Sequence, residues 1–423
     1  MSATSTWMFF VSPGSRTILL IKSKFMSRFA LGTTSACQQS DLTCSYVLRP
    51  IGNRSTTPHL HNYPFAMSVP KIQKALVLPA KYADFVVRSI AVPKPGPGQL
   101  LVKVHAVGLN PVDWKIQKNG IIVQEFPGIV GSDVAGTVEE LGEGVKGFSL
   151  GDKVVEQGHF AVPNAGFQQY TVANADITAK IPDNITFEQA ATLPVGLSTA
   201  ALGLYEQVVA PDQDYGTLGL QAPWEEGGRG KYAGKPFVVI GAGSSVGQYV
   251  IQFAKLSGFS PIIATASLHN AEFLRSLGAT HVLDRNLTLE QLREETAKIT
   301  KEPLDLIYDS VALPETQLAS YELLAPGGTL ALVLYTAIPE ERLRPDKKIV
   351  RPFGQANFPV ENRTVAAEVY GKQLTTWLKE GVIKPNRVEV LPNGLEGIVD
   401  GLERLRNHSV SGVKLVAHPQ ETV

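Results

Sequence analysis

A glycine-rich segment near the centre of the chain joins an apolar run to a helical one, as in phosphate-binding loops. The apolar run is Phe237–Ile240, and the glycine-rich segment Gly241–Gly247 follows it directly. The N-terminus of a helix presents free N–H groups and a partial positive charge, which favour phosphate. Gly241 permits a tight turn, Gly243 lets the backbone approach a pyrophosphate, and Gly247 allows close helix–strand packing. The residues predicted to hold a dinucleotide are Gly241, Gly243, Ser244, Ser245, Val246 and Gly247.

The next apolar segment indicates which dinucleotide is bound. Sites for NAD place an acid about 20 residues beyond the glycines, where it bonds the ribose 2′-hydroxyl. The segment Ile262–Asn270 contains no acid, so nothing there would repel a 2′-phosphate. Thr265, Ser267, His269 and Asn270 can donate hydrogen bonds to that phosphate. The tip of this segment has no Arg or Lys of its own, and Arg275 or Arg285 could reach back to supply the positive charge. These features predict NADP as the cofactor.

Composition excludes several other classes of function. Lys and Arg together number 39, and so do Asp and Glu, so no net charge attracts nucleic acid or an anionic membrane. No apolar run reaches the ~18 residues of a membrane-spanning helix. Cys37 and Cys44 are the only cysteines. The chain beyond residue 44 therefore has no disulfide framework, thiolate metal site or cysteine nucleophile.

Residues 1–66 differ in composition from the rest of the chain. They contain a single acid, Asp41, with scattered Arg and Lys and many Ser and Thr. Such a segment resembles a mitochondrial transit peptide. The other interpretation is an upstream extension of the gene model, with translation starting at Met67. On either interpretation we predict a disordered leader, because the segment has no sustained periodicity. The predicted location is cytoplasmic, or mitochondrial if the leader is translated.

Short β-type runs broken by Pro and Gly occupy the chain up to about residue 190. Gln99–Leu109 and Val134–Leu141 are examples, and they predict a compact, mostly antiparallel β unit. Thr186 and Gln189 have the spacing of a helix capping box, and helical periodicity continues to Leu204. The Gly-rich stretch Val209–Lys235 is predicted to be a surface loop.

From Pro236 the pattern becomes an alternation of strands and helices, which predicts a parallel sheet with helices on both faces. The expected strands are Phe237–Ile240, Pro261–Ala266, His281–Leu283, Leu304–Tyr308 and Thr329–Tyr335. The expected helices are Val246–Leu256, Ala271–Leu277, Leu289–Thr300 and Pro314–Leu324. Later helices near Asn362–Lys379 and Leu395–Asn407 lead to a last strand, Gly412–Ala417, which is expected to close on the β unit.

A series of motifs between Lys74 and Pro419 resembles the medium-chain dehydrogenase/reductase superfamily. The motifs are, in order, Gly108–Lys115, Pro127–Val138, Gly151–Val154, Leu193–Ala200 and Ala325–Thr329. The resemblance implies a chaperonin-10-like antiparallel β domain plus a Rossmann doubly wound parallel sheet. It places the first domain at 67–190, completed by 345–423, and the NADP-binding Rossmann domain at 191–344. Within the superfamily, the chain is most similar to quinone reductases and fungal trans-acting enoyl reductases.

Departures from the superfamily pattern bear on the chemistry. Its zinc alcohol dehydrogenases bind catalytic zinc with two cysteines and a histidine, and alignment by motif puts Asn110, Ser132 and Val195 at those positions. Valine cannot ligate a metal, and Asn and Ser are poor zinc ligands. His105, His159 and Asp133 lack ligand spacing as substitutes. Without a Lewis acid, a substrate activated by its own conjugation is favoured. The predicted partner is therefore a small-molecule enone, quinone or enoyl thioester, which takes up hydride without a metal.

The resemblance also assigns roles to single residues. Lys115 is the predicted proton donor, although it would equally suit a solvated loop edge. Asn110 and Asp113 either shape the catalytic cleft or only cap and stabilise a turn. Thr199 is expected near the nicotinamide. Tyr335 is expected near its carboxamide, with an ordinary packed aromatic as the alternative.

Two other functions remain open at this stage. One is a non-catalytic NADPH-binding sensor, because no acid–base group in the sequence is unambiguous. The other is an enoyl reductase that works with a polyketide synthase and depends on an acyl carrier protein. The oligomeric state that we consider for this chain is a homodimer.

Overall fold

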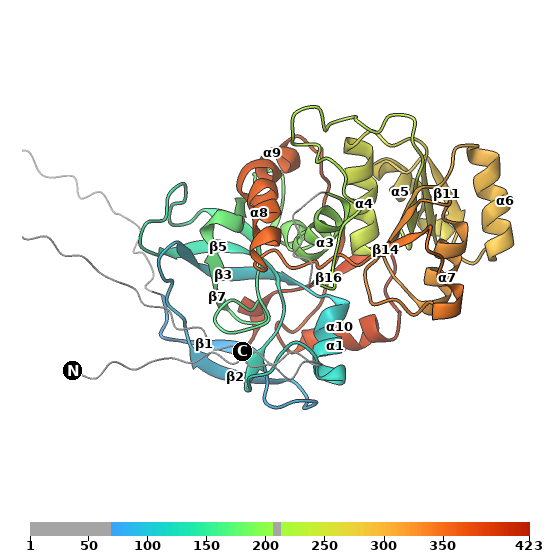
Figure 1. The fold of residues 1–423 in the computed structure, drawn as a ribbon. Helices are drawn as coiled ribbons and strands as arrows, with labels where there is room; N and C mark the ends of the chain where they lie inside the picture. Colours follow the sequence, from blue (N-terminus) through green and yellow to red (C-terminus); the bar gives the residue numbers. More distant parts are fainter. Residues whose placement is uncertain (1–68, 206–212) are drawn as a thin grey trace, which may run out of the picture. The chain divides into compact units, whose positions relative to one another are not determined.

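The structure is a computed structural model, and it describes residues 69–205 and 213–423. The predicted leader, residues 1–66, lies outside the described residues, as does the start of the predicted loop at 209–212. Two sheets with their own helices make up the described part (Figure 1). The helices of this part are all too short or too polar to cross a bilayer.

A mainly antiparallel sheet of seven strands forms the first lobe, which we call the β lobe. Its order is β15-β16-β3-β5-β6-β8, with β7 also paired to β3, and β2-β1-β4 form a smaller sheet beside it. The central strands are buried along most of their length, and two register shifts between β3 and β5 help the sheet to curve. The strands are β1 Ile72–Leu78, β2 Val86–Ala91, β3 Gln99–Gly108, β4 Gly128–Ile129, β5 Asp133–Leu141, β6 Lys153–Gln157, β7 Tyr170–Asn174, β8 Thr178–Lys180, β15 Arg387–Val390 and β16 Val413–Ala417.

The end of the chain returns to this lobe, as the sequence predicts. Strand β16 pairs antiparallel with β3, with Val416 opposite Gly108. Helix α10 (Gly397–Arg406) packs on α1 (Pro111–Asn119). The predicted turn in this part of the Gly108–Lys115 motif is wrong, because residues from Pro111 onward form a helix. Pro111 at the first helical position and Gly120 in the left-handed C-cap are the start and stop signals that reasoning passed over.

The second lobe, which we call the nucleotide lobe, contains a fully parallel sheet of six strands in the order β11-β10-β9-β12-β13-β14. The predicted alternation and fold class are confirmed. From β9 the chain builds outward to β10 and β11, and it then returns to place β12 on the other side, so β9 and β12 form a topological switch point. The strands are β9 Phe237–Ile240, β10 Ile262–Ala266, β11 His281–Asp284, β12 Leu306–Asp309, β13 Thr329–Leu332 and β14 Lys348–Val350. The helices that alternate with them are α4 Ser245–Leu256, α5 Ala271–Leu277, α6 Leu289–Ile299 and α7 Pro314–Leu323.

Strand β13 ends at Leu332, so the predicted strand Thr329–Tyr335 is three residues too long, and Tyr335 lies in the following loop. Strand β14 was not predicted, because its three residues are too few to show a periodicity. It extends the parallel sheet beyond residue 344, although the division into domains stays a prediction.

Helices between the two sheets form the junction. The capping box is present at α2 (Phe187–Ala190), where Gln189 N donates to Thr186 Oγ1 over 3.2 Å and Thr186 N donates to Gln189 Oε1 over 3.0 Å. A new helix, α3, then begins at Pro194 and runs to Leu204, so the continuous helix expected there is two helices. Helices α8 (Val360–Glu368) and α9 (Leu374–Lys379) are joined by a π-helical turn, Val369–Gln373.

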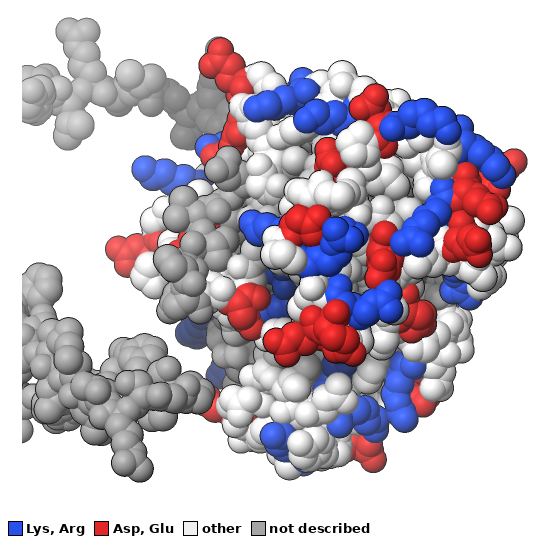
Figure 2. Space-filling model, turned by 45° about the vertical axis from the view of Figure 1, so that its right-hand side comes forward, with Lys and Arg blue, Asp and Glu red and all other residues white. Residues whose placement is uncertain are grey.

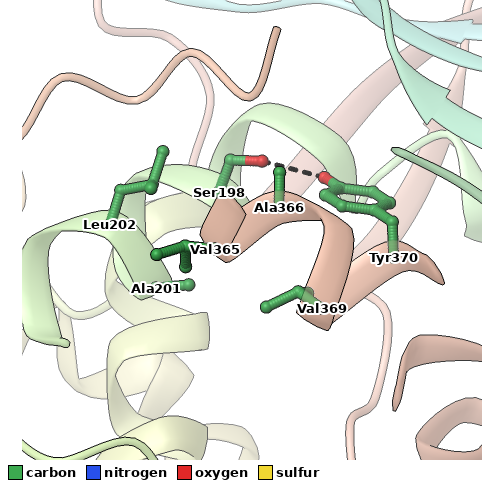
Figure 3. Close-up of a pocket in the computed structure, with 7 residues that line it drawn as sticks. All are labelled: Ser198, Ala201, Leu202, Val365, Ala366, Val369 and Tyr370. Carbon is green, nitrogen blue, oxygen red and sulfur yellow. Dashed lines mark hydrogen bonds between the residues drawn. The ribbon is translucent and has the colours of Figure 1, made fainter. Parts of the chain in front are cut away.

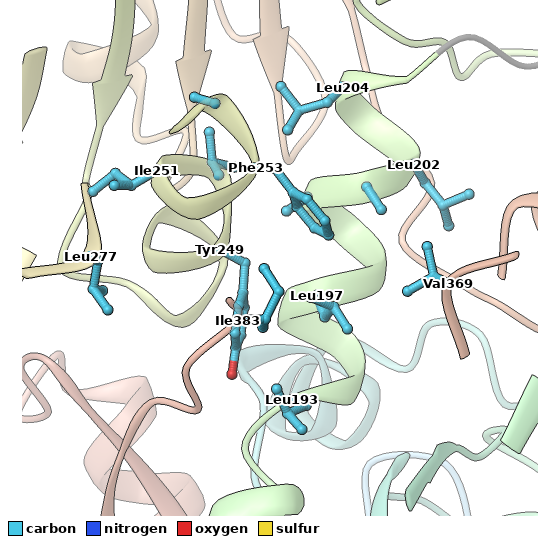
Figure 4. Close-up of a cluster of buried hydrophobic side chains, with 14 of the residues drawn as sticks. Leu193, Leu197, Leu202, Leu204, Tyr249, Ile251, Phe253, Leu277, Val369 and Ile383 are labelled. Atoms are coloured by element: carbon cyan, nitrogen blue, oxygen red, sulfur yellow. The ribbon is translucent and has the colours of Figure 1, made fainter. Parts of the chain in front are cut away.

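The main core lies where α3 packs on α4. Leu197 and Leu204 of α3 belong to this core with Tyr249 and Phe253 of α4, whereas Leu202 points to the other side of α3, toward Val369 (Figure 4). The ring of Phe253 also lies 5.6 Å from the ring of Tyr205 and 6.0 Å from that of Trp377, measured between centroids. This contact joins α4 of the parallel sheet to α3 and α9.

On the other side of α3, a small hollow lies against α8 and the π-helical turn (Figure 3). Most of the side chains that line it are apolar. The polar groups are the hydroxyls of Ser198 and Tyr370, which form a hydrogen bond of 2.9 Å with each other. We regard it as a packing defect between helices. On the face shown in Figure 2, Lys and Arg side chains are interspersed with Asp and Glu, in keeping with the balanced composition.

Replacing Phe253 by Ala is expected to destabilise the fold by about 3–5 kcal/mol, because the side chain is fully buried among aromatic rings that cannot close the cavity. Urea unfolding followed by tryptophan fluorescence and circular dichroism measures the change. Val399→Ala on α10, where the side chain is 41% exposed, is the control and should change the free energy by no more than about 0.5 kcal/mol. Equal effects for the two variants would contradict this account of the core.

Candidate active site

The glycine-rich loop has the backbone geometry that its sequence suggests. Gly241 has a φ of +70°, and a Cβ built on it would lie 2.6 Å from Val311 Cγ1. A Cβ on Gly247 would lie 2.7 Å from Ala242 Cα, so the helix packs on the turn too closely for a side chain. A Cβ built on Gly243 would have Asn270 Nδ2 as its nearest neighbour, 3.7 Å away. The loop is therefore tight on its protein side and open at Gly243.

Two serines of the loop are used to hold α4 in place. Ser244 caps the helix: its Oγ accepts from Gly247 N over 3.0 Å and donates to Ser310 Oγ over 3.0 Å. Ser245 Oγ donates to Asn386 Oδ1 over 2.6 Å. The first turn of α4 can therefore bind a phosphate through its backbone N–H groups and through the helix dipole. The binding role of these residues and of Val246 stays a prediction.

The end of β10 carries the residues predicted to face the adenosine ribose. Ser267 is half-buried, His269 is exposed and Asn270 is buried. His269 Nε2 lies 3.1 Å from Ser411 Oγ, and Asn270 Nδ2 lies 3.2 Å from the same atom. Ser411 precedes β16, so two parts of the chain separated by about 140 positions meet at this point. No local sequence signal could have predicted that meeting.

Thr199 and Tyr335 occupy different settings. Thr199 lies in α3, and its Oγ1 donates to Val195 O over 2.7 Å. A Cβ on Gly354 would lie 2.0 Å from Thr199 Oγ1, so the loop 353–357 presses directly on this threonine. Tyr335 is 68% exposed, and its hydroxyl donates to Asp214 Oδ2 over 2.8 Å. Tyr335 is therefore an exposed ring with the Arg351 guanidinium 4.2 Å from its centre and not an ordinary packed aromatic, while its role at the carboxamide stays a prediction.

Loop 353–357 is fixed from the β lobe by Gln157, which sequence reasoning missed. Its amide donates to Gly354 O over 2.8 Å and accepts from Ala356 N over 3.0 Å. Asn357 Nδ2 in turn donates to Gln157 O over 2.6 Å. Gln157 is buried at the end of β6, so a strand of the β lobe sets the position of the loop beside Thr199.

A buried ion pair occupies the place where the motif alignment puts metal ligands. Lys414 Nζ donates to Asp133 Oδ2 over 2.7 Å and to Asn110 Oδ1 over 2.6 Å. Asn110 Nδ2 donates to the same carboxylate over 2.9 Å, and Val195 N donates to its other oxygen over 2.7 Å. The side chains of Lys414 and Asp133 are only 4% and 0% exposed. Asn110 and Val195, which align with metal-ligand positions, thus both bind the buried ion pair. Asn110 contacts the ammonium and the carboxylate, and Val195 N contacts the carboxylate.

Asp113 lies beside this cluster in the first turn of α1. Its Oδ2 accepts from Asn110 N over 2.8 Å, which is the capping role that the sequence analysis considered. Burial raises the pKa of Asp113 to about 7, despite the backbone N–H of Asn110 that lowers it. Its Oδ1 is buried without a hydrogen-bond partner among the described residues, as a carboxyl that is partly protonated at neutral pH allows.

Lys115 lies in α1, two residues beyond Asp113, and not at the edge of a loop. It is half-buried, with Nζ 5.7 Å from the centre of the Trp114 ring. Burial lowers its pKa, and the described part of the chain places no carboxylate within ion-pair distance of it. It is a cation without a counter-ion in the described ranges, on the helix that Asn110 caps.

The donor set at the aligned positions does not fit a metal ion. Ser132 is fully buried, and its hydroxyl has no partner in the described ranges. His105 instead stacks on Phe187, with ring centres 4.5 Å apart, and His159 lies against Phe358. Within residues 69–205 and 213–423, no group of three His, Cys, Asp or Glu residues is arranged to bind a metal. A second positive charge beside Lys414 would also be repelled.

Comparisons with known proteins agree with this architecture. Residues 96–183 match the family model of the alcohol dehydrogenase GroES-like domain, and 245–371 match the model described as zinc-binding dehydrogenase. Trans-enoyl reductase himH of Aspergillus japonicus is 34% identical over 328 residues, which cover 75% of this chain and 89% of that protein. Trans-enoyl reductase resD of Aspergillus sclerotiorum is 34% identical over 346 residues, covering 75% and 92%. A mycobacterial structure in complex with NADPH has a TM-score of 0.63 at 24% identity and covers 82% of this chain and 100% of its own.

Removing the ammonium of Lys414 tests the buried cluster. Lys414→Met is expected to destabilise the protein by about 3–5 kcal/mol, because it leaves Asp133 charged, buried and uncompensated. Unfolding in urea gives the free energy. The double variant Lys414→Met/Asp133→Asn should recover part of the loss, since it removes the unpaired charge.

Lys180→Met is the matched control. Its ion pair with Asp152 is 2.8 Å long but exposed, and breaking it should cost less than about 1 kcal/mol. A loss of that small size in Lys414→Met would mean that Lys414 does not compensate the buried carboxylate.

Proposed function

Because the chain belongs to the medium-chain dehydrogenase/reductase superfamily and is an oxidoreductase, we propose that it is a zinc-independent, NADPH-dependent reductase. Its substrate is a carbon–carbon double bond or quinone activated by conjugation. The observation that carries the proposal is the ammonium of Lys414, hydrogen-bonded to Asn110 and Asp133 where a metal site would otherwise stand. A site without a Lewis acid favours acceptors that stabilise the incoming charge themselves.

The cofactor would lie along the carboxyl ends of β9 and β10. The loop Gly241–Gly247 and the first turn of α4 would hold its pyrophosphate, with Gly243 giving the open side. The acid-free end of β10, with Ser267, His269 and Asn270, supports NADP over NAD. Bound NADPH supplies the hydride, and Thr199 of α3 would form the wall beside the reacting ring.

The residues of the β lobe then have two tasks. Charge that develops on the substrate oxygen after hydride arrives at the β-carbon needs a hydrogen-bond donor, and the α-carbon needs a proton. Lys115 can act as donor and acid, because its ammonium has no carboxylate partner in the described part of the chain and its pKa is lowered by burial. Asn110 and Asp113 would hold the start of α1, and with it Lys115, in position.

The names of the relatives support the proposed class of acceptor. The two fungal relatives are named trans-enoyl reductases, which supports an enoyl thioester as the substrate, and other structural neighbours are named quinone oxidoreductases. An acyl chain carried on an acyl carrier protein is the narrower form of the same proposal. Free enones and quinones are the simpler probes of the reaction.

Purified protein is expected to oxidise NADPH faster than NADH with at least one acceptor among quinones, enals and enoyl thioesters. The rate should be unchanged after dialysis against a chelator, because no step needs a metal. Loss of turnover with chelator and its return with zinc would contradict the proposal. Tight NADPH binding without turnover on the whole panel would instead support the sensor hypothesis.

Lys115→Met tests the proposed proton donor. We expect kcat to fall by about 10²–10⁴, the usual contribution of a general acid, with the Kd of NADPH unchanged. In the unaltered enzyme, the rate should fall as pH rises through the lowered pKa of Lys115, because only the protonated amine donates. The variant should lack this fall.

Lys118→Met on the same helix is the control, because its ammonium pairs with Asp84 at the surface over 3.7 Å. It should retain both the rate and the pH profile. Equal rates for the Lys115 and Lys118 variants would exclude Lys115 from catalysis.

A further inference from the structure

One arginine in the described part of the structure, Arg387, is held by neutral groups and not by a carboxylate. Arg387 Nε donates to Gly412 O over 3.1 Å, and its Nη2 donates to Asn270 Oδ1. The guanidinium lies 4.3 Å from the centre of the Phe273 ring. In the described part of the chain, Arg387 forms no ion pair with a carboxylate, whereas many other arginines do. The paired arginines are Arg293, Arg342, Arg344, Arg351, Arg363, Arg404 and Arg406.

The position of Arg387 relative to the glycine-rich loop is fixed through Asn270. The amide of Asn270 accepts from Arg387 on one side, and its Nδ2 lies 3.7 Å from the Cβ position of Gly243 on the other. Asn270 is only 1% exposed, so it is a rigid spacer between the guanidinium and the loop. The ribose of a dinucleotide whose pyrophosphate lies on Gly243 must pass this point.

Further hydrogen-bond donors gather at the same point. The Oγ of Ser411 lies 3.1 Å from His269 Nε2 and 3.2 Å from Asn270 Nδ2. Gly412, with a φ of +67°, has no room for a Cβ, which would lie 2.4 Å from both Asn270 Oδ1 and Arg387 Nη2. The β lobe thus places a cation and a hydroxyl against the end of β10.

We propose that Arg387, with Ser411 and His269, binds the 2′-phosphate of NADP, so that the β lobe and not the nucleotide lobe supplies the charge that selects this cofactor. The inference rests on the proposed function, because it assigns the 2′-phosphate subsite of the same nucleotide site. A guanidinium that is planar, fixed by neutral acceptors and stacked on a ring is preorganised for a phosphate.

The other candidates for this charge are less well placed. Arg285 follows β11, and its recorded contact with β10 is through its backbone, whose N–H donates to Ala266 O over 3.0 Å. Arg275 lies in the last turn of α5, beyond Phe273, and its side chain is exposed. The nearest acids do not neutralise the site: Asp284 accepts from Asn286 N in its own turn over 2.9 Å, and Glu272 is exposed on α5.

Binding of dead-end nucleotides to the full chain tests the subsite without any need for turnover. The probes are adenosine 2′,5′-bisphosphate and adenosine 5′-monophosphate, measured by calorimetry at fixed ionic strength. The unaltered protein should bind the bisphosphate more tightly. Arg387→Gln keeps a hydrogen-bonding side chain without the charge. It should weaken bisphosphate binding by about tenfold to a hundredfold, the value of a hydrogen bond to a charged group, and leave the monophosphate affinity unchanged.

Arg275→Gln is the matched control and should bind both nucleotides as the unaltered protein does. Equal loss of both ligands in Arg387→Gln, or no loss of either, would overturn the proposal, as would an unaltered protein that binds both probes equally. Failure of the proposed function is a separate result: an enzyme inactive on every acceptor could still show the selective loss of bisphosphate binding. Ser411→Ala should cause a smaller loss in the same direction.

Discussion

The buried contact between Lys414 and Asp133 is the interaction on which the arrangement of the active-site residues depends. An isolated charge in a protein interior is very costly, so each of the two side chains requires the other. The remaining oxygen of Asp133 accepts from Val195 N, and Lys414 also donates to Asn110. The pair therefore ties together the last strand of the β lobe, the start of α1 and the start of α3. Any substitution that removes one charge disturbs all of these elements together.

Most of the fold could be predicted from the sequence, because its signals are local. Strand β9 and helix α5 have the predicted bounds, since each is a periodic run ended by glycine. Helix α1 was not predicted, because two of its three buried side chains, Asp113 and Gln117, are polar and leave no clear apolar periodicity. Strand β14 was missed because three residues carry no periodicity. Short elements are held by their neighbours in the sheet, and a local pattern does not reveal those neighbours.

The candidate site was predicted only in part, for the same physical reason. The glycine-rich loop and the end of β10 are continuous in sequence, so their residues could be named. Lys414 lies 304 positions from Asn110, and Arg387 lies 117 positions from Asn270, and these contacts exist only because β15 and β16 return to the β lobe. Motif alignment did identify Asn110, Ser132 and Val195 as the altered ligand positions. It could not show that a lysine from the end of the chain would lie among them.

Under the proposals above, the same return of the chain would give the two lobes a shared role in binding the cofactor. In a Rossmann sheet, the nucleotide lobe alone can hold a pyrophosphate through backbone N–H groups, and this contact does not distinguish NADP from NAD. Discrimination calls for groups that recognise the ribose 2′-phosphate, and under the proposal above the charge among them would be Arg387, on β15 of the β lobe. The β lobe also sets the loop beside Thr199 through Gln157. A cofactor that reaches from Arg387 to Thr199 would contact residues positioned by the β lobe at both of its ends. The fixed position of one lobe against the other would then contribute to the preference for NADP over NAD. On this view, the metal-free ion pair at the junction supports cofactor selection as well as the chemistry, because it holds α3 against the lobe that carries Arg387.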